Sequence, residues 1–370
     1  MRPNWIWQQV DWPNFIWKND EVIGVLSRVK LKQGFLLGQL TSLGFDVQRN
    51  ASLEAITEDV IRSSEIEGVM LDPVRVRSSV ASRLGLETQG LPIPDHYTAG
   101  LVEVMLDAVQ NATLPLSKER LFNWHAALFP TGRSGMTPIT VANYREGEAP
   151  MQIVSGAMGH EKVHYEAPAS SDIPQEMERF IDWVNEYNEI DLVIKAAVAH
   201  LWFVAIHPFD DGNGRLTRTI TDMLLSRADG QSLRFYSMSA AILKRKKSYY
   251  EALQETNHGN LDITNWILWF LETMESAIDD SFAIVDRVKY KAVFWQHHGD
   301  VVLNERQIKV LNKLMDGFEG KMTTSKYAKI THSSQATALR DIQDLLGKGL
   351  LLKNESGGRS TNYELPSLSS

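Results

Sequence analysis

The 370-residue chain contains no cysteine, which excludes disulfide bonds, thiolate nucleophiles and zinc sites built on thiolates. It also lacks long apolar runs: Ala196–Ile206, among the longest, is interrupted by His200 and falls well short of the roughly 20 residues of a membrane span. The start, Met1–Trp17, carries Trp, Gln, Asp and Pro where a secretory signal would be uninterrupted and apolar. We therefore expect a cytoplasmic protein that does not enter a membrane.

A strong positive charge is missing as well. The net charge is −8, with 38 Lys and Arg against 46 Asp and Glu, which argues against a chain that coats nucleic acid. The hydrophobic fraction of 43% and the charged fraction of 23% are ordinary values, and they indicate a globular protein with a real core. At this length, two or three domains are expected.

Apolar periodicity indicates that the chain is mainly helical. Val22–Leu43 and Leu53–Ile66 are typical of helices, and residues 90–94, which are rich in Gly and Pro, are a plausible seam after them. We assign residues 1–95 to an N-terminal helical domain. Residues 96–295 form a second helical block, interrupted by Pro130–Pro168, and we expect this block to be the catalytic core.

The last segment, residues 296–370, has a different pattern. Helical periodicity in Asn304–Phe318, Ser325–Ile330 and Ser333–Leu346 is followed by two short β-like runs, Leu350–Lys353 and Asn362–Leu365. Three helices followed by a strand, a turn and a strand are typical of a winged helix. Basic and acidic residues alternate along it, so DNA binding is conceivable but is not the favoured function.

The run His207–Arg218 carries the strongest chemical signal. It follows Asp191–Ile206, an apolar stretch typical of a buried helix, and it opens another helix. Gly212 and Gly214 would let backbone N–H groups approach an anion at the new helix N-terminus, where the helix dipole favours negative charge. Arg215 and Arg218 are three residues apart, so we expect them to share a face and to bind a polyphosphate.

Two further groups belong to the same run. Asp211 supplies the hard oxygen ligand that Mg²⁺ takes when it also binds phosphate. His207 could remove a proton from a hydroxyl, because an imidazole has a near-neutral pKa. Taken singly, His207 could merely end one helix and Asn213 merely cap the next. Twelve positions that fit one site make that interpretation unlikely.

The run resembles the signature of the Fic (filamentation induced by cAMP) family, His-Pro-Phe-x-(Asp/Glu)-Gly-Asn-Gly-Arg-x-x-Arg, and every specified position matches. The resemblance implies that His207 activates a Ser, Thr or Tyr hydroxyl of a target protein, which attacks the α-phosphate of ATP. It also implies that Asp211 holds Mg²⁺ and that pyrophosphate leaves. The phosphates would be bound by Gly212, Asn213, Gly214, Arg215 and Arg218.

The small residue at position 214 bears on the type of reaction. The related Doc kinases carry a Lys near this point and turn the nucleotide so that it donates its γ-phosphate. Gly214 therefore favours AMP transfer, although the family also includes members that transfer phosphocholine.

A second motif lies upstream. Continuing the apolar stripe of Leu53–Ile66 by helical steps leads to Ser63 and Glu67, and a carboxylate on a buried stripe needs a partner. Alternatively, Glu67 simply faces water at the helix end. Ser63-Ser64-Glu65-Ile66-Glu67-Gly68 resembles the inhibitory helix of Fic proteins, (Ser/Thr)-x-x-x-Glu-(Gly/Asn). The resemblance implies that Glu67 pairs with Arg218 and keeps ATP out of its reactive pose.

The hairpin expected over Gln152–Tyr165 resembles the Fic flap, which pairs with an extended segment of the target by β-augmentation. Downstream, Tyr250 and Asn257 are seven residues apart on a likely helix and share a face, where they could hold adenine. Tyr249 is an equally good candidate, and core packing is a close alternative. The flap residues that we expect to face the target are Ile153, Val154, Val163 and His164.

The sequence thus predicts a mainly α-helical, self-inhibited protein adenylyltransferase that uses ATP and Mg²⁺. Two alternatives stay open. One is a hydrolase that removes AMP, alone or as a second activity, with Glu67 aligning a water molecule. The other is a transcription regulator in which the Fic core senses nucleotide. Modification of the chain itself and homo-oligomerisation are further possibilities that the resemblance raises.

Overall fold

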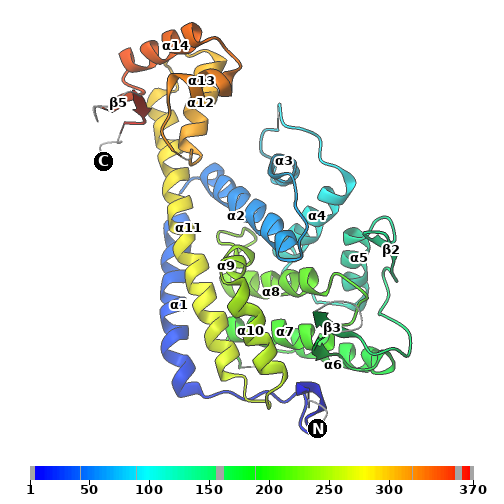
Figure 1. The fold of residues 1–370 in the computed structure, drawn as a ribbon. Coiled ribbons are helices and arrows are strands. Elements are labelled where there is room, and N and C mark those ends of the chain that lie inside the picture. The colour runs from blue at the N-terminus through cyan, green and yellow to red at the C-terminus, as the bar shows by residue number, and fades with distance from the viewer. Residues whose placement is uncertain are drawn as a thin grey trace. The chain divides into compact units, whose positions relative to one another are not determined.

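Figure 1 shows a mainly helical chain, as expected from the sequence. The computed structural model describes residues 5–366 except residues 42, 89, 156–161, 188, 319 and 355–360. Close contacts divide the chain into two compact units, Met1–Ser281 and Phe282–Ser370. The finer division expected at residue 95 stays a prediction.

The first unit contains most of the helices. They are α1 (Asn19–Thr41), α2 (Phe45–Ile66), α3 (Pro73–Arg83), α4 (His96–Gln110), α5 (Lys118–Leu128), α6 (Ile173–Asn185), α7 (Leu192–Ile206), α8 (Asn213–Asp229), α9 (Met238–Lys244), α10 (Lys246–Asn257) and the first part of α11 (Thr264–His298). Two short 3₁₀ turns are η1 (Ile6–Gln8) and η2 (Ser170–Asp172). The strands of this unit are β1 (Arg133–Ser134), β2 (Thr137–Pro138), β3 (Gln152–Ser155) and β4 (Lys162–Glu166).

The centre of the first unit is the pair of helices α7 and α8, which pack side by side (Figure 1). All residues of α7 from Val193 to Ile206 are buried, which confirms that the apolar stretch is a central helix. Asp191 caps its start by accepting a hydrogen bond from the Val193 N–H at 2.8 Å. At the other end, Pro208 cannot continue a helix, so α7 stops where the motif begins.

Helix α2 packs against α3, α9 and α8. It begins at Phe45, eight residues before the expected start, because its first two turns are polar and give no apolar stripe. It ends at Ile66, and Gly68 follows with a φ of 80°, a left-handed conformation that suits glycine at a helix C-terminus. Glu67 is therefore the C-cap residue that directly follows α2.

The predicted hairpin is present. β3 and β4 pair antiparallel, with Ile153 opposite Tyr165 and Val154 opposite Val163, and the register shifts between Ile153 and Val154. The expected turn between these strands lies outside the described residues. β4 is anchored on α7, because the buried Tyr165 hydroxyl donates to the Ala205 carbonyl at 2.6 Å.

The second unit has its own apolar core, to which Phe294, Leu311, Tyr327 and Ile342 belong. Helices α12 (Glu305–Met315), α13 (Thr324–Thr331) and α14 (Gln335–Gly347) are followed by the antiparallel strands β5 (Leu352–Asn354) and β6 (Asn362–Glu364). Asp341 on α14 points inward, since it accepts a 2.7 Å hydrogen bond from Arg306 and is 6% exposed. The order of elements is the one expected from the sequence.

Among the described residues, no helix has both the length and the apolar character needed to cross a bilayer.

Candidate active site

The motif histidine occupies a constrained position at the end of α7. His207 has a φ of 51°, which is uncommon for a residue other than glycine. Its N–H still donates to the Phe203 carbonyl at 3.0 Å, so the left-handed turn closes the helix and redirects the chain. The side chain of His207 lines a cavity of about 450 Å³.

The protonation of His207 suits a general base. Nδ1 lies 3.3 Å from the Val204 carbonyl oxygen, which can only accept, so Nδ1 carries the ring proton and Nε2 has a free lone pair. Burial lowers the pKa of His207 to about 4, and the positive charge of Arg145 lowers it further, against the opposing effects of the Val204 carbonyl, Glu67 and Asp211. The ring is therefore neutral at neutral pH and can accept a proton.

Arg145 holds the backbone of the motif loop. Its Nε donates to the His207 carbonyl at 2.8 Å, and its backbone N–H donates to the Pro208 carbonyl at 2.9 Å. Arg145 is only 5% exposed, so these bonds are shielded from water. They fix the constrained turn at His207 from outside α7.

The inside of the loop is held by Phe209 and Asn213. Phe209 is fully buried and stacks on His125 at a ring distance of 4.3 Å and an angle of 13°. The Asn213 amide accepts from the Phe209 N–H at 3.0 Å and donates to the Phe209 carbonyl at 2.7 Å. Because both amide groups of the Asn213 side chain bond to the loop backbone, Asn213 would bind an anion through its backbone N–H.

His125 completes this framework. The Ala142 N–H donates to His125 Nδ1 at 3.2 Å, so the proton of the neutral ring is on Nε2, which donates to the Asp211 carbonyl at 3.1 Å. Burial is the main cause of the lowered pKa of His125, which keeps the ring neutral. His125 is therefore a support of the loop.

Two glycines open the N-terminus of α8. Gly212 has a φ of 83°, and a Cβ there would lie 2.8 Å from the Phe129 ring. At Gly214, a Cβ would overlap the Glu67 carboxylate. Position 212 therefore requires glycine, whereas a larger residue at position 214 would have to displace the flexible end of Glu67. The N-terminus of α8 offers backbone N–H groups to an anion.

The two motif arginines take different partners. Arg215 donates to the Tyr97 hydroxyl at 3.0 Å, covers the Phe129 ring at 4.8 Å and lies 3.7 Å from an Asp211 carboxylate oxygen. Both Arg215 and Arg218 are buried, with 6% and 2% exposure. They lie on neighbouring turns of α8, but only Arg218 reaches α2.

Arg218 is held by the end of α2. Its Nε donates to Ser63 Oγ at 2.9 Å, and its Nη2 donates to the Ser63 carbonyl at 2.9 Å and to Glu67 Oε1 at 2.7 Å. Glu67 thus reaches the second motif arginine, in the arrangement that the sequence motif led us to expect. Only 34% of the Glu67 side chain is exposed, and it also lines the cavity of His207.

The cavity of about 450 Å³ has the size of a small-molecule site. It brings together residues from α2, the hairpin, the motif and α10: Glu67, Ile153, His164, Tyr165, Val204, His207, Asn213, Gly214, Tyr249, Tyr250, Leu253, Gln254 and Asn257. Asn257 is 3% exposed, and its Oδ1 is buried without a hydrogen-bond partner among the described residues. An unsatisfied buried acceptor at this position suits a ligand that donates an N–H.

The flap residues divide into two groups. Ile153 and His164 line the cavity, whereas Val154 and Val163 do not, and they are 47% and 38% exposed. In the described part of the hairpin, the sheet has two strands, so a further strand could add to it.

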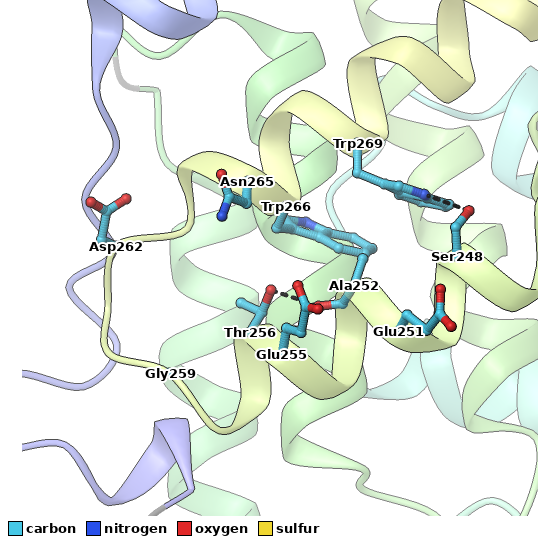
Figure 2. Close-up of a pocket in the computed structure, with 10 residues that line it drawn as sticks. All are labelled: Ser248, Glu251, Ala252, Glu255, Thr256, Gly259, Asp262, Asn265, Trp266 and Trp269. Atoms are coloured by element: carbon cyan, nitrogen blue, oxygen red, sulfur yellow. Dashed lines mark hydrogen bonds between the residues drawn. The ribbon is translucent and has the colours of Figure 1, made fainter.

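A second cavity, of about 440 Å³, lies between α10 and the start of α11 (Figure 2). Its rim carries the carboxylates of Glu251, Glu255 and Asp262, and no Lys or Arg lines it. Trp266 and Trp269 stack at its floor, with ring centroids 5.4 Å apart. A polyphosphate would be repelled there, so the cavity of His207 is the better nucleotide site.

A divalent cation could be held beside the motif. No group of three or more His, Asp or Glu residues suited to a metal occurs among the described residues. Asp211 offers a single carboxylate, 41% exposed, which the Ser134 hydroxyl and the Gly212 N–H orient by short hydrogen bonds. One carboxylate fits Mg²⁺, because this ion takes most of its remaining ligands from water and substrate phosphates.

Several supporting residues were not predicted from the sequence. Tyr97 and Ser134 lie 118 and 77 residues from their partners in the motif, and nothing in their neighbourhood in the sequence distinguishes them. Asn143-Tyr144-Arg145 fits the usual approach to the Fic flap, but the sequence did not predict that Arg145 supports the motif loop. His125 has a weak signal, as a histidine on an apolar helix, but that pattern equally fits core packing.

Comparison with known families gives two matches. Residues 5–86 match a domain of unknown function (DUF4172), and residues 115–225 match the Fic/DOC family. Residues 115–225 are therefore a Fic/DOC domain. The match covers the loop, α7 and most of α8, where the geometry described above is found.

The chain is similar to the protein adenylyltransferases Fic of Drosophila willistoni and Drosophila mojavensis, to which it is 28% and 27% identical over 233 and 237 residues. Each alignment covers 62% of this chain but only 42% of the relative. The chain therefore spans less than half the length of these relatives.

Solved structures show the same fold. A Fic family protein from Desulfovibrio desulfuricans matches 95% of this chain and 97% of its own, with a TM-score of 0.52 and 17% identity. Fic-1 from C. elegans matches 72% of this chain and 75% of its own, with a TM-score of 0.50 and 18% identity.

Proposed function

We propose that this chain transfers AMP from ATP to a hydroxyl group of a protein and that Glu67 holds the resting enzyme at low activity. The observation that carries the proposal is the shared cavity: a neutral His207, the glycine-lined N-terminus of α8 and the pair Glu67–Arg218 meet in one place. The similarity to the protein adenylyltransferases of Drosophila supports the same reaction.

In this reaction, the hydroxyl oxygen of the target bonds to the α-phosphorus of ATP. The bond from that phosphorus to the oxygen that bridges the α- and β-phosphates breaks, and pyrophosphate leaves with that oxygen. His207 Nε2 receives the hydroxyl proton, which it can do because its Nδ1 already carries the ring proton. Mg²⁺ held by Asp211 would neutralise phosphate charge when bound.

The chain's other groups would bind and orient ATP. The N–H groups at the start of α8 face the phosphates, and Arg215 and Arg218 supply positive charge beside them. Asn257 Oδ1 would accept a hydrogen bond from the amino group of adenine, and guanine has no amino group at that position of the ring. Tyr250 would pack against the adenine ring. The pairing of Arg218 with Glu67 competes with this role, so releasing Glu67 should activate the enzyme.

The target would bind along the hairpin. Ile153 and His164 face the cavity and the other flap residues are exposed, so an extended peptide added to the β3–β4 edge would pass His207. Main-chain hydrogen bonds would set the register of the peptide and bring one of its hydroxyl groups to His207.

The decisive test compares wild type, Glu67→Gly and Glu67→Gly/His207→Ala, each with Mg²⁺ and ATP labelled at the α-phosphate. Label on the chain itself and on proteins of a cell lysate would be measured. We expect strong labelling by Glu67→Gly alone. Glu65→Gly is the matched control, because Glu65 is a neighbouring carboxylate that pairs with Arg62 and not with Arg218. No label from any variant that binds ATP would refute AMP transfer.

A second candidate function is removal of AMP from a modified protein. Glu67 and His207 line the same cavity, in which both could act on one water molecule. Release of labelled AMP from a modified protein by wild type, but not by Glu67→Gly, would establish this activity.

A further inference from the structure

The C-terminus of α2 is held partly by side chains from other helices. The last four residues of a helix present carbonyls that have no partner further along the helix. In α2 these residues are Ser63, Ser64, Glu65 and Ile66. The turn at Gly68 satisfies the middle two, because the Gly68 N–H donates to the Glu65 carbonyl at 3.0 Å and the Val69 N–H donates to the Ser64 carbonyl at 2.9 Å. The first and the last of the four need donors from outside α2.

Two cations supply these donors. Arg218 Nη2 on α8 donates to the Ser63 carbonyl at 2.9 Å. Lys246 Nζ, at the start of α10, donates to the Ile66 carbonyl at 2.7 Å. The helix dipole favours a cation at this end of α2. Because Glu67 directly follows Ile66, the bond from Lys246 holds the main chain one residue before the carboxylate that contacts Arg218.

The position of Lys246 is unfavourable for its own helix. The first turn of α10 carries Lys246 and Lys247 and no acidic residue, although the helix dipole favours negative charge there. The neighbouring cations pair with carboxylates: Lys244 with Asp280, Arg245 with Glu272 and Lys247 with Glu251. Among the described residues, no ion pair joins Lys246 to a carboxylate, and its ammonium group bonds to the end of α2 instead.

The chain after Glu67 does not hold this carboxylate in place. A Cβ built on Gly68 would meet no atom of the described residues within 4 Å, so the turn faces open space. The position of Glu67 therefore depends on the last turn of α2. That turn is held by the buried side chain of Ile66 and by the bond from Lys246.

We propose that Lys246 is a positioning residue of the resting enzyme. Through the Ile66 carbonyl it fixes the last turn of α2, and it thereby places the Glu67 carboxylate beside the second motif arginine. Helix α10 also lines the cavity of His207 with Asn257, so the bond ties the inhibitory helix to a wall of that cavity. Release of Glu67 then requires this bond to break as well. The consequence for AMP transfer rests on the proposed function.

This role differs from that of a lysine that merely caps a helix. The side chain of Ile66 is only 2% exposed, and its packing alone could hold the end of α2. Lys246 would then satisfy a carbonyl and do no more, so its removal would leave Glu67 in place and the enzyme inhibited. If Lys246 positions Glu67, its removal frees the last turn of α2 and weakens inhibition.

The test uses the full chain with Lys246→Met, which keeps an unbranched side chain and removes the ammonium group. Lys247→Met is the matched control, because Lys247 is the next residue of the same helix, is 92% exposed and pairs with Glu251. Hydrogen exchange of the two amides in the turn after Glu67, and of the Arg218 Nε–H, would report on the end of α2 in the resting protein. Labelling by ATP labelled at the α-phosphate, in the wild-type and Glu67→Gly backgrounds, would report on inhibition.

We expect exchange at these three sites to be about ten-fold faster in Lys246→Met than in Lys247→Met, as for the loss of one hydrogen bond from a charged donor. Labelling should rise by about the same factor in Lys246→Met when Glu67 is present, and it should not rise further in the Glu67→Gly background. Equal exchange in the two lysine variants would overturn the proposal. So would unchanged labelling in Lys246→Met, or an equal rise in both backgrounds. If Glu67→Gly gives no label, the proposed function fails, while the exchange rates still decide the role of Lys246.

Discussion

The carboxylate of Glu67 occupies the space that the absent side chain of Gly214 leaves open. A Cβ built on Gly214 would overlap Glu67 Oε1, the same oxygen that lies 2.7 Å from Arg218 Nη2. The motif glycine therefore has two roles at once. It leaves the N-terminus of α8 open to an anion, and it makes room for the residue that competes with that anion.

The first prediction concerns this contact. Gly214→Ala should lower the free energy of unfolding of the wild type by about 1 kcal/mol, because Glu67 must move aside and its hydrogen bond to Arg218 is weakened. In the Glu67→Gly background the cost should be clearly smaller, because the overlapping carboxylate is gone. Denaturant unfolding of the four proteins of this double-mutant cycle measures the coupling. Equal costs in both backgrounds would contradict the contact.

The second prediction concerns Arg145, which holds the loop at His207. Arg145→Met should lower the free energy of unfolding by about 1–3 kcal/mol, because two buried carbonyls lose charged donors. In the Glu67→Gly background it should reduce kcat for AMP transfer more than it raises KM for ATP. Arg133→Met is the control, since Arg133 is exposed and donates only to its own turn. Equal losses of stability and of kcat in Arg145→Met and Arg133→Met would show that Arg145 does not support the loop.

A third prediction follows from the pKa of His207, which burial lowers to about 4 from an ordinary value of 6.5. The lowered pKa means that the ring stays neutral as the pH falls through 6.5. Ring signals of His207, assigned by their loss in His207→Ala, should therefore stay constant from about pH 8 to about pH 5.5. Glu67→Gln should lower the pKa further, because the Glu67 charge raises it. A midpoint near 6.5 would show that the ring is not shielded as described.

The fourth prediction concerns a buried acidic cluster between α2 and α8. Asp222 is fully buried, and burial raises its pKa, followed by the charge of Asp59 on α2, although Arg234 lies 2.8 Å from it. The folded protein thus binds this proton more tightly than the unfolded chain. Its contribution to stability is present below the ordinary value of 3.8 and is lost as the pH rises through the raised pKa.

Asp222→Asn should flatten that dependence. The contribution of Asp222 to the free energy of unfolding should fall as the pH rises above 3.8, by at most about 1.4 kcal/mol per pH unit, and the variant should lack this component relative to the wild type. Urea unfolding at a series of pH values measures the slope. Asp229→Asn is a comparison within the same cluster, because Asp229 also pairs with Arg234. Identical slopes in wild type and Asp222→Asn would rule out a raised pKa.

Much of the fold could be predicted because its signals are local. The apolar α7, the hairpin strands and the three helices of the second unit each repeat a pattern with the period of their own structure. The start of α2 was missed because Asp46, Gln48, Arg49 and Asn50 give its first turns no apolar stripe. Helix α3 was not expected either, since it is short and rich in serine and arginine.

The site could be predicted only in part. The motif residues His207, Asp211 and Gly212 lie within six consecutive positions of the chain, so their type and order indicate a common site. Their supports come from elsewhere: Arg145 and His125 reach the loop from other segments. A residue that acts through hydrogen bonds to distant backbone atoms leaves no periodicity in a single sequence.

The sequence by itself determined the chemistry of the loop, because the twelve residues His207–Arg218 supply a base, glycines, a carboxylate and two cations in an order that suits one anion. Only the tertiary structure decided what each cation contacts. Arg215 and Arg218 are three residues apart, yet α4 offers Tyr97 to one and α2 offers Ser63 and Glu67 to the other. The physical reason is that a long buried side chain takes the hydrogen-bond partners that the neighbouring helices present, and helix packing alone determines which helices those are.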